Sequence, residues 1–300
     1  MSDLPGGVIA AVPTPIDENG KPDIGRFLQH CRWALENGCD GLNVLGSTGE
    51  ASSFGLADRT AIMEAAAREL DASKLMVGTG LTDAASTIEM TSLAAKLGFA
   101  VALVLPPYYY KPVTDEGIFR YFRNLCDATS STPVPLFLYN YPAMTGVPFS
   151  PEVVARMASE LDGRVCGIKD SSADITYCKS LVQAIPGFNV FPSSETCLAS
   201  AKVDGFAGCI SATINITGPI AARIWRDESY DGRDNDAVFI ADIRGRVAAN
   251  PLIPAVKYVV SEQQGDDNFS RVLLPFAPLT EDQKNSIRAI ADQVAAHANA

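Results

Sequence analysis

The stretch AVALVLP, residues 100–106, is apolar at every position before its closing proline. A strand with one face in water alternates apolar and polar side chains, whereas an unbroken apolar run is typical of a strand buried on both faces of a parallel sheet. Similar, mostly apolar runs without clean alternation occur at 7–12, 41–46, 74–80, 134–140, 164–170, 188–193 and 205–211. These runs predict eight strands of one parallel sheet.

Amphipathic segments separate the runs. Residues 23–38, DIGRFLQHCRWALENG, carry Ile24, Phe27, Cys31 and Leu35 close to helical spacing. Eight strand–helix units predict an α/β fold, a (β/α)8 TIM barrel with additional C-terminal helices. A doubly wound open sheet is the main alternative. The count of eight and the lack of a nucleotide-binding fingerprint favour the barrel.

The predicted organisation is a (β/α)8 barrel over residues 1–228 and a C-terminal helical extension over 229–300. A formal charge of −11 makes nucleic acid an unexpected partner. No basic leader or long apolar run is present, so no membrane association is expected. Seven cysteines without a C-x-x-C pair are typical of a reduced, cytoplasmic protein.

The chain has two histidines, His30 and His297. A histidine-dependent triad or a multi-histidine metal site is therefore not expected, and we predict neither a metal nor a cofactor. Acid–base chemistry would have to use Lys, Tyr, Asp or Glu.

In a TIM barrel the active site lies at the carboxyl ends of the strands. Lys169 ends the apolar run RVCGIKD, residues 164–170, so its amine is expected near the barrel axis. Loss of water lowers the pKa of an amine, and a neutral amine can form a Schiff base with a ketone. The alternatives are a lysine that reaches solvent or one that pairs with Asp170.

Tyr139 ends the preceding strand, next to Lys169 at the predicted mouth. Its phenol could move protons during imine formation and carbon–carbon cleavage, although it could equally be a packing residue.

The loop NVLGSTGEAS, residues 43–52, follows another strand. Gly46 and Gly49 permit a tight turn and a close backbone approach to a ligand. Ser47 and Thr48 offer hydroxyl donors beside backbone N–H groups, a combination suited to a small carboxylate. An ordinary turn, with Ser47 or Thr48 capping the next helix, is the alternative.

Taken in order, several short motifs resemble those of the dihydrodipicolinate synthase / N-acetylneuraminate lyase family, class I pyruvate-dependent aldolases. They cover essentially the whole chain. These motifs are TP (14–15), GCDGL (38–42), GSTGE (46–50), PPYY (106–109), YNYP (139–142), GIKDSS (167–172) and NPLIPAVKY (250–258).

The resemblance implies that Lys169 forms the Schiff base and that Tyr139 transfers protons. Ser47 and Thr48 would bind the carboxylate of a 2-oxo acid, helped by the backbone at Ile210. Tyr109 resembles a tyrosine that crosses a subunit interface into the neighbour's proton relay. The resemblance also implies a homotetramer built as a dimer of dimers.

One departure from the family pattern bears on the substrate. Dihydrodipicolinate synthases place an arginine shortly after YN-x-P, where this chain has Met144. Methionine cannot bind a carboxylate through charge-assisted hydrogen bonds. Ser194 and Glu195 lie where sugar-acid aldolases carry residues that face the substrate, although a surface turn explains them equally well.

The sequence thus predicts a metal-independent lyase or aldolase that joins or cleaves pyruvate and an aldehyde, with a 2-keto-3-deoxy sugar acid or similar 2-oxo acid as substrate. The alternatives are a 4-hydroxy-tetrahydrodipicolinate synthase, a dehydratase and, in another class, a non-catalytic barrel that binds 2-oxo acids.

Overall fold

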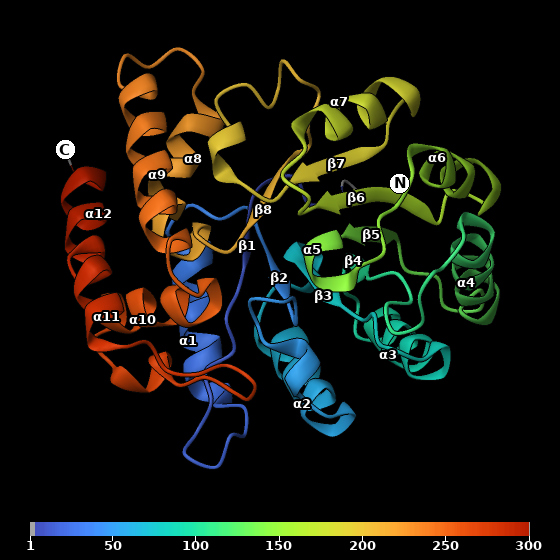
Figure 1. The fold of residues 1–300 in the computed structure, drawn as a ribbon, viewed down its shortest axis with the longest axis horizontal. Coiled ribbons are helices and arrows are strands. Elements are labelled where there is room, and N and C mark those ends of the chain that lie inside the picture. The colour runs from blue at the N-terminus through green and yellow to red at the C-terminus, as the bar shows by residue number, and fades with distance from the viewer. Residues whose placement is uncertain (1–3, 300) are drawn as a thin grey trace.

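The computed structural model describes residues 4–299 and contains eight parallel strands arranged around a common centre (Figure 1). The strands are β1 Gly7–Ala11, β2 Gly41–Val44, β3 Leu75–Gly78, β4 Val101–Val104, β5 Leu136–Asn140, β6 Val165–Asp170, β7 Asn189–Pro192 and β8 Gly208–Ser211. Each lies within one of the apolar runs identified in the sequence.

The strands form one sheet in the order β7-β6-β5-β4-β3-β2-β1-β8. The two edge strands lie against each other, and Ala207 N–H donates to the carbonyl of Val190 at 3.0 Å. The sheet is therefore a nearly closed barrel, and the prediction of a (β/α)8 barrel is confirmed.

Helices follow the strands in alternation and cover the outside of the barrel, except for the short helix at Pro142–Thr145, which lies near the centre of the barrel in front of the strands (Figure 1). They are α1 Ile24–Glu36, α2 Leu56–Glu69, α3 Ala84–Lys96, α4 Asp115–Ala128, α5 Pro142–Thr145, α6 Pro151–Glu160, α7 Ile175–Ala184 and α8 Ile214–Arg226. The expectation of eight complete strand–helix units is wrong at the seventh. Only a 3-10 turn, Glu195–Cys197, and further turns connect β7 to β8.

Several helices begin at side chains that accept a backbone N–H of the first turn. Asp23, Asp83, Thr114, Ser150 and Asp174 cap α1, α3, α4, α6 and α7, respectively. Such caps stabilise a helix by about 1 kcal/mol each. The capping residues fix where each helix starts and so limit the length of the loop that leads into it.

The barrel has two cores. Inward side chains form a small cluster that includes Phe137, Tyr139, Phe191 and Ile210, while outward side chains pack against the helices. On β6, a Cβ added at Gly167 would lie 2.5 Å from the ring of Phe137. The absence of a side chain at Gly167 leaves room for the Phe137 ring. Gly167 faces the barrel interior, as Lys169 does two residues later on the same strand.

Four helices follow the barrel: α9 Arg233–Ala248, α10 Leu252–Gln264, α11 Glu281–Ile287 and α12 Ile290–Ala298. They pack beside α8 along one side of the molecule, and α10 contacts α8, α9, α11 and α12 (Figure 1). None of the helices within residues 4–299 has the length and apolar character needed to cross a membrane.

Candidate active site

Lys169 and Asp170 point to opposite faces of β6. Asp170 accepts hydrogen bonds from the side chain of Asn140 at 2.6 Å and the hydroxyl of Ser172 at 2.7 Å. Lys169 lies inside the barrel with 4% of its surface exposed, and across residues 4–299 no carboxylate lies within ion-pair distance of its amine. Both alternatives, a lysine extended into solvent and a pair with Asp170, are therefore excluded.

Burial lowers the pKa of the Lys169 amine from 10.5 to about 7. The neighbouring Cys209 opposes this shift and the positive charge of Arg244 adds to it. At neutral pH a large fraction of this amine is consequently uncharged and nucleophilic.

Tyr139 is the register partner of Lys169 across β5 and β6. The amine of Lys169 lies 4.5 Å from the centre of the Tyr139 ring, and the phenol oxygen lies 3.1 Å from the Ser47 hydroxyl. Burial raises the pKa of the phenol, while the hydrogen bond with Ser47 opposes the rise. The phenol thus remains protonated, with a hydrogen-bonded hydroxyl available to exchange a proton.

The loop after β2 carries Ser47 and Thr48 into the site. A Cβ on Gly46 would lie 2.5 Å from the amide of Asn43, so a larger residue here would have to displace that buried side chain. The following helix α2 begins after Gly55, and neither Ser47 nor Thr48 caps it. The alternative of a simple helix cap is therefore excluded.

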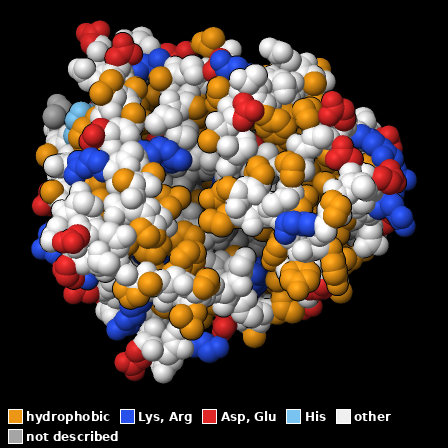
Figure 2. Space-filling model, in the orientation of Figure 1, with side chains coloured by type: hydrophobic (Ala, Val, Ile, Leu, Met, Phe, Trp, Pro, Cys, Tyr) orange, Lys and Arg blue, Asp and Glu red, His pale blue; other side chains and the backbone are white. Residues whose placement is uncertain are grey.

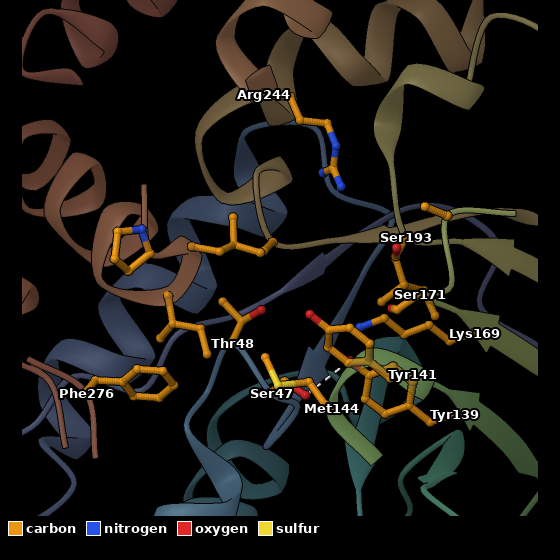
Figure 3. Close-up of a pocket in the computed structure, with 16 residues that line it drawn as sticks. Ser47, Thr48, Tyr139, Tyr141, Met144, Lys169, Ser171, Ser193, Arg244 and Phe276 are labelled. Carbon is orange, nitrogen blue, oxygen red and sulfur yellow. Dashed lines mark hydrogen bonds between the residues drawn. The ribbon is translucent and has the colours of Figure 1, made fainter. Parts of the chain in front are cut away.

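These groups line one cavity of about 360 Å³ at the carboxyl ends of the strands (Figure 3). Figure 2 shows that face of the molecule hollowed near its centre. Of the residues predicted from the sequence, the cavity wall contains Lys169, Tyr139, Ser47, Thr48, Ile210 and Met144.

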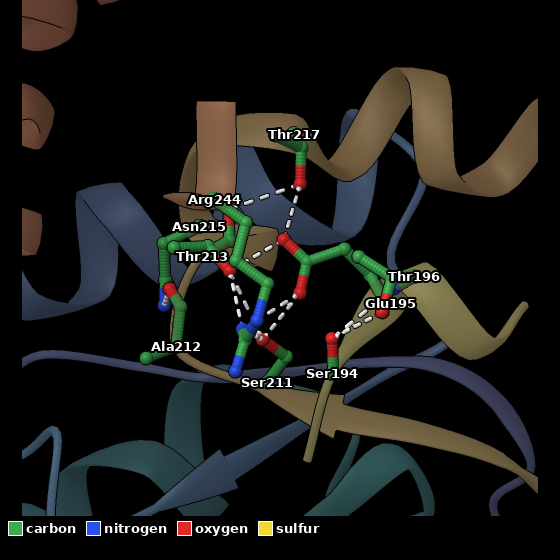
Figure 4. A network of polar contacts seen from close by, with 9 residues as sticks. All are labelled: Ser194, Glu195, Thr196, Ser211, Ala212, Thr213, Asn215, Thr217 and Arg244. Carbon is green, nitrogen blue, oxygen red and sulfur yellow. Dashed lines mark hydrogen bonds and ion pairs between the residues drawn. The ribbon is translucent and has the colours of Figure 1, made fainter. Parts of the chain in front are cut away.

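Four predicted residues, Gly46, Tyr109, Ser194 and Glu195, do not line this cavity. Ser194 bonds Thr196 at 2.7 Å and does not line this cavity, whose wall instead contains its neighbour Ser193. Glu195 is fully buried, and its carboxylate accepts hydrogen bonds from Ser211 and Thr213 (Figure 4). The full burial of Glu195 speaks against its direct contact with a substrate, whereas Ser194 lines an adjoining cavity of about 510 Å³ that shares Ser193 and Arg244 with this one.

Tyr109 also lies away from the cavity of its own chain. Its side chain is 72% exposed and stacks edge-on against Tyr110. Tyr108, not Tyr109, lines an adjoining cavity of about 240 Å³.

Sequence reasoning missed the part of the wall that comes from α9, α10 and the segment after them. Arg244 lies on α9, Leu252 and Ile253 begin α10, and Phe276 follows in the chain. The motif NPLIPAVKY contains two of these residues, but no local pattern distinguishes Arg244 from the other arginines of α9. Within residues 4–299 no group of three or more His, Cys, Asp or Glu side chains could hold a metal ion.

A model of the Dihydrodipicolinate synthetase family matches residues 4–294. The chain belongs to this family. A curated relative from Chloroflexus aurantiacus, described as an uncharacterized DapA-like lyase, is 30% identical and covers 97% of this chain and 98% of its own. The 4-hydroxy-tetrahydrodipicolinate synthase of Gluconacetobacter diazotrophicus is 32% identical over 94% of each chain.

The crystal structure of YagE, an Escherichia coli prophage protein of the dihydrodipicolinic acid synthase family in complex with pyruvate, superposes with a TM-score of 0.87. The two are 27% identical, with 98% of this chain and 99% of the other covered. Membership in the dihydrodipicolinate synthetase family confirms the resemblance seen in the sequence. The chain is an enzyme of the pyruvate-dependent lyase and aldolase class.

Proposed function

We propose that the protein forms a Schiff base between Lys169 and the keto carbon of a 2-oxo acid, and cleaves or forms a carbon–carbon bond between pyruvate and an aldehyde. The observation that carries this proposal is a buried amine with a pKa of about 7 beside the Tyr139–Ser47 hydrogen bond. A neutral amine attacks the keto carbon, and water leaves as the iminium forms.

In the cleavage direction, the C4 hydroxyl of the bound substrate gives up its proton as the C3–C4 bond breaks. The bonding electrons move into the iminium and leave an enamine, while the C4 fragment departs as an aldehyde. Protonation at C3 and hydrolysis then release pyruvate and restore Lys169. Tyr139 is proposed to take up the C4 hydroxyl proton as it passes its own to Ser47 along their 3.1 Å hydrogen bond, while Ser47 releases its proton to water in the cavity. The same relay run in reverse supplies the proton that C3 of the enamine takes up.

The hydroxyls of Ser47 and Thr48, with the backbone at Ile210, are proposed to bind the carboxylate next to the keto carbon. Tyr109 is proposed to join the relay of a neighbouring subunit, since its own chain leaves it exposed. A homotetramer built as a dimer of dimers and a cytoplasmic location complete the proposal.

The physiological substrate is proposed to be a 2-keto-3-deoxy sugar acid or a similar 2-oxo acid. A second candidate is 4-hydroxy-tetrahydrodipicolinate synthase activity, which condenses pyruvate with aspartate semialdehyde, because a relative at 32% identity carries that name. Met144 weighs against it, since its apolar side chain offers no charge to the second substrate. A non-catalytic binding barrel has less support, because such a protein would not need a depressed lysine pKa.

A substrate panel tests this proposal. Purified protein is assayed for pyruvate release from 2-keto-3-deoxy sugar acids and hydroxy-2-oxo acids, and for condensation of pyruvate with aspartate semialdehyde. We expect cleavage of at least one 2-oxo acid, no change in rate with EDTA, and loss of activity in Lys169→Met. Fast turnover of aspartate semialdehyde would favour the second candidate, and full activity in Lys169→Met would overturn the mechanism.

A further inference from the structure

Arg244 is a permanent cation in the wall of the cavity. Among the residues that line this cavity, it and Lys169 are the two that carry basic groups. Because the amine of Lys169 is consumed by imine formation, Arg244 is the lining residue left to meet an anionic group elsewhere on the substrate. Figure 3 shows its guanidinium end pointing from α9 into the cavity, toward the side where Lys169 and Tyr141 lie.

Buried hydrogen-bond acceptors hold the guanidinium of Arg244 in this position. Its Nη1 donates to the carboxylate of Glu195 at 3.1 Å, to the Ser211 hydroxyl at 3.0 Å and to the Thr213 hydroxyl at 2.9 Å (Figure 4). Glu195 itself has no exposed surface. A side chain fixed in this way loses little conformational entropy when it binds a ligand.

The remaining donors of Arg244 are free to bind a ligand. Throughout residues 4–299, neither Nε nor Nη2 of this side chain donates to another protein group, and the side chain is 25% exposed. The Nε and Nη2 edge of a guanidinium matches the two oxygens of a carboxylate, and a charged acceptor binds it about twice as strongly as a neutral one.

We propose that Arg244 is a specificity-determining residue that binds a carboxylate at the far end of the substrate, and that the enzyme prefers 2-oxo acids with a second, distal carboxylate. The inference rests on the proposed function, since the first carboxylate and the keto group must lie at Ser47, Thr48 and Lys169. A phosphate is disfavoured, because a single cation already shared with Glu195 matches one negative charge better than two.

Non-cleavable analogues test this without knowledge of the natural substrate. The diacids 2-oxoglutarate and 2-oxoadipate are compared with the monoacids 2-oxopentanoate and 2-oxohexanoate, which have the same chain lengths. Each is incubated with the protein, reduced with borohydride and quantified as the adduct on Lys169 by mass spectrometry. We expect at least one diacid to reach half-maximal labelling at a concentration about tenfold or more below that of its monoacid.

The variants Arg244→Met and Arg244→Lys are compared with Arg246→Met, a control on the same helix whose partners, Asp242 and Gln293, lie outside the cavity. The diacid preference should fall to about twofold or less in Arg244→Met, be reduced in Arg244→Lys and persist in the control. The preference is the ratio of two half-maximal concentrations, diacid and monoacid, measured on the same variant. A general loss of Lys169 reactivity affects both concentrations and therefore leaves the ratio unchanged. If Arg244→Met does not fold, the diacid preference of Arg244→Lys tests the assignment of Arg244.

The possible failures are distinct. If no 2-oxo acid, pyruvate included, labels Lys169 in the unmodified protein, the proposed function fails. If diacids and monoacids label Lys169 equally well, or the diacid preference survives in both Arg244 variants, the proposed function stands and the assignment of Arg244 is overturned.

Discussion

The amine of Lys169 lies among aromatic and apolar groups of the barrel interior, and this position decides its chemistry. Gly167 makes room for Phe137 on the same face of the strand, while Tyr139 lies alongside in register. The amine loses water without gaining a carboxylate, so its charged form is disfavoured. The nucleophile is therefore produced mainly by burial, with a contribution from the positive charge of Arg244, and needs no adjacent base.

The lowered pKa sets the pH dependence of imine formation. The nucleophilic form of the amine is the deprotonated one, so at subsaturating pyruvate the initial rate of trapped adduct should rise with pH and level off above about pH 7. Quenched-flow borohydride trapping between pH 5.5 and 9 measures this initial rate. A rate that keeps rising toward pH 10 would mean that the amine has its ordinary pKa.

Tyr139 is expected to affect turnover strongly. In Tyr139→Phe the ring remains but the proton relay to Ser47 is lost, so kcat for aldol cleavage should fall by about 100- to 10,000-fold. Tyr121→Phe is the matched control, because the Tyr121 hydroxyl bonds Thr87 at 2.8 Å outside the cavity. Equal kcat values in the two variants would remove Tyr139 from the chemistry.

An ion pair connects the loop of Ser47 and Thr48 to the C-terminal helices. Glu50 ends this turn with a φ of 54°, and its carboxylate binds the amine of Lys257 on α10. The same carboxylate accepts the N–H of Leu273 at 2.6 Å, and Lys257 donates to the carbonyl of Thr14 at 3.0 Å. Helix α10 thus helps to hold the loop of Ser47 and Thr48 in place.

Breaking this pair should be costly. Both side chains are fully buried, so Lys257→Met leaves a buried carboxylate without its counterion and should lower the free energy of unfolding by about 3–5 kcal/mol. Glu50→Gln added to Lys257→Met should recover part of the loss, since a neutral amide needs no counterion. Urea unfolding measures each step.

Lys284→Met, which removes an ion pair with the exposed Glu281, serves as the control and should leave the urea midpoint nearly unchanged. If the urea midpoint of Lys257→Met differs from that of the unmodified protein as little as the midpoint of the control does, the buried pair does not support the loop.

The sequence predicted those parts of the site that end strands of the barrel. Lys169, Tyr139 and the loop at Gly46 follow apolar runs, and a barrel brings the ends of such runs together. Arg244 could not be predicted in this way, because it reaches the cavity only through the packing of α9 beside α8, and local sequence does not encode that arrangement. Glu195 was misplaced because position along the chain does not reveal which way a side chain after β7 turns.

The proposed role of Tyr109 in proton transfer cannot be fulfilled within a single chain. Tyr109 is 72% exposed and outside the cavity, yet the family resemblance gives it a part in the proton relay. Both observations are reconciled if the site is completed by a second copy of the chain.

Mixing an impaired variant with an inactive one tests this arrangement. Tyr109→Phe should reduce kcat by about tenfold or more, whereas Tyr110→Phe, at a neighbour that is also highly exposed, should not. When Tyr109→Phe is refolded together with Lys169→Met, mixed assemblies contain sites with an intact Lys169 and a donated Tyr109. Activity should therefore rise above that of either variant alone. Activity no higher than the average of the two would place Tyr109 outside its neighbour's site.

Peptide mapping after borohydride reduction detects the covalent bond between Lys169 and the keto carbon of pyruvate, on which the proposed mechanism depends. Protein incubated with pyruvate, reduced and digested should carry the reduced adduct on the peptide that contains Lys169, and Lys169→Met should carry none. An unmodified Lys169 peptide, or an adduct on another lysine such as Lys257, would show that Lys169 does not form the Schiff base.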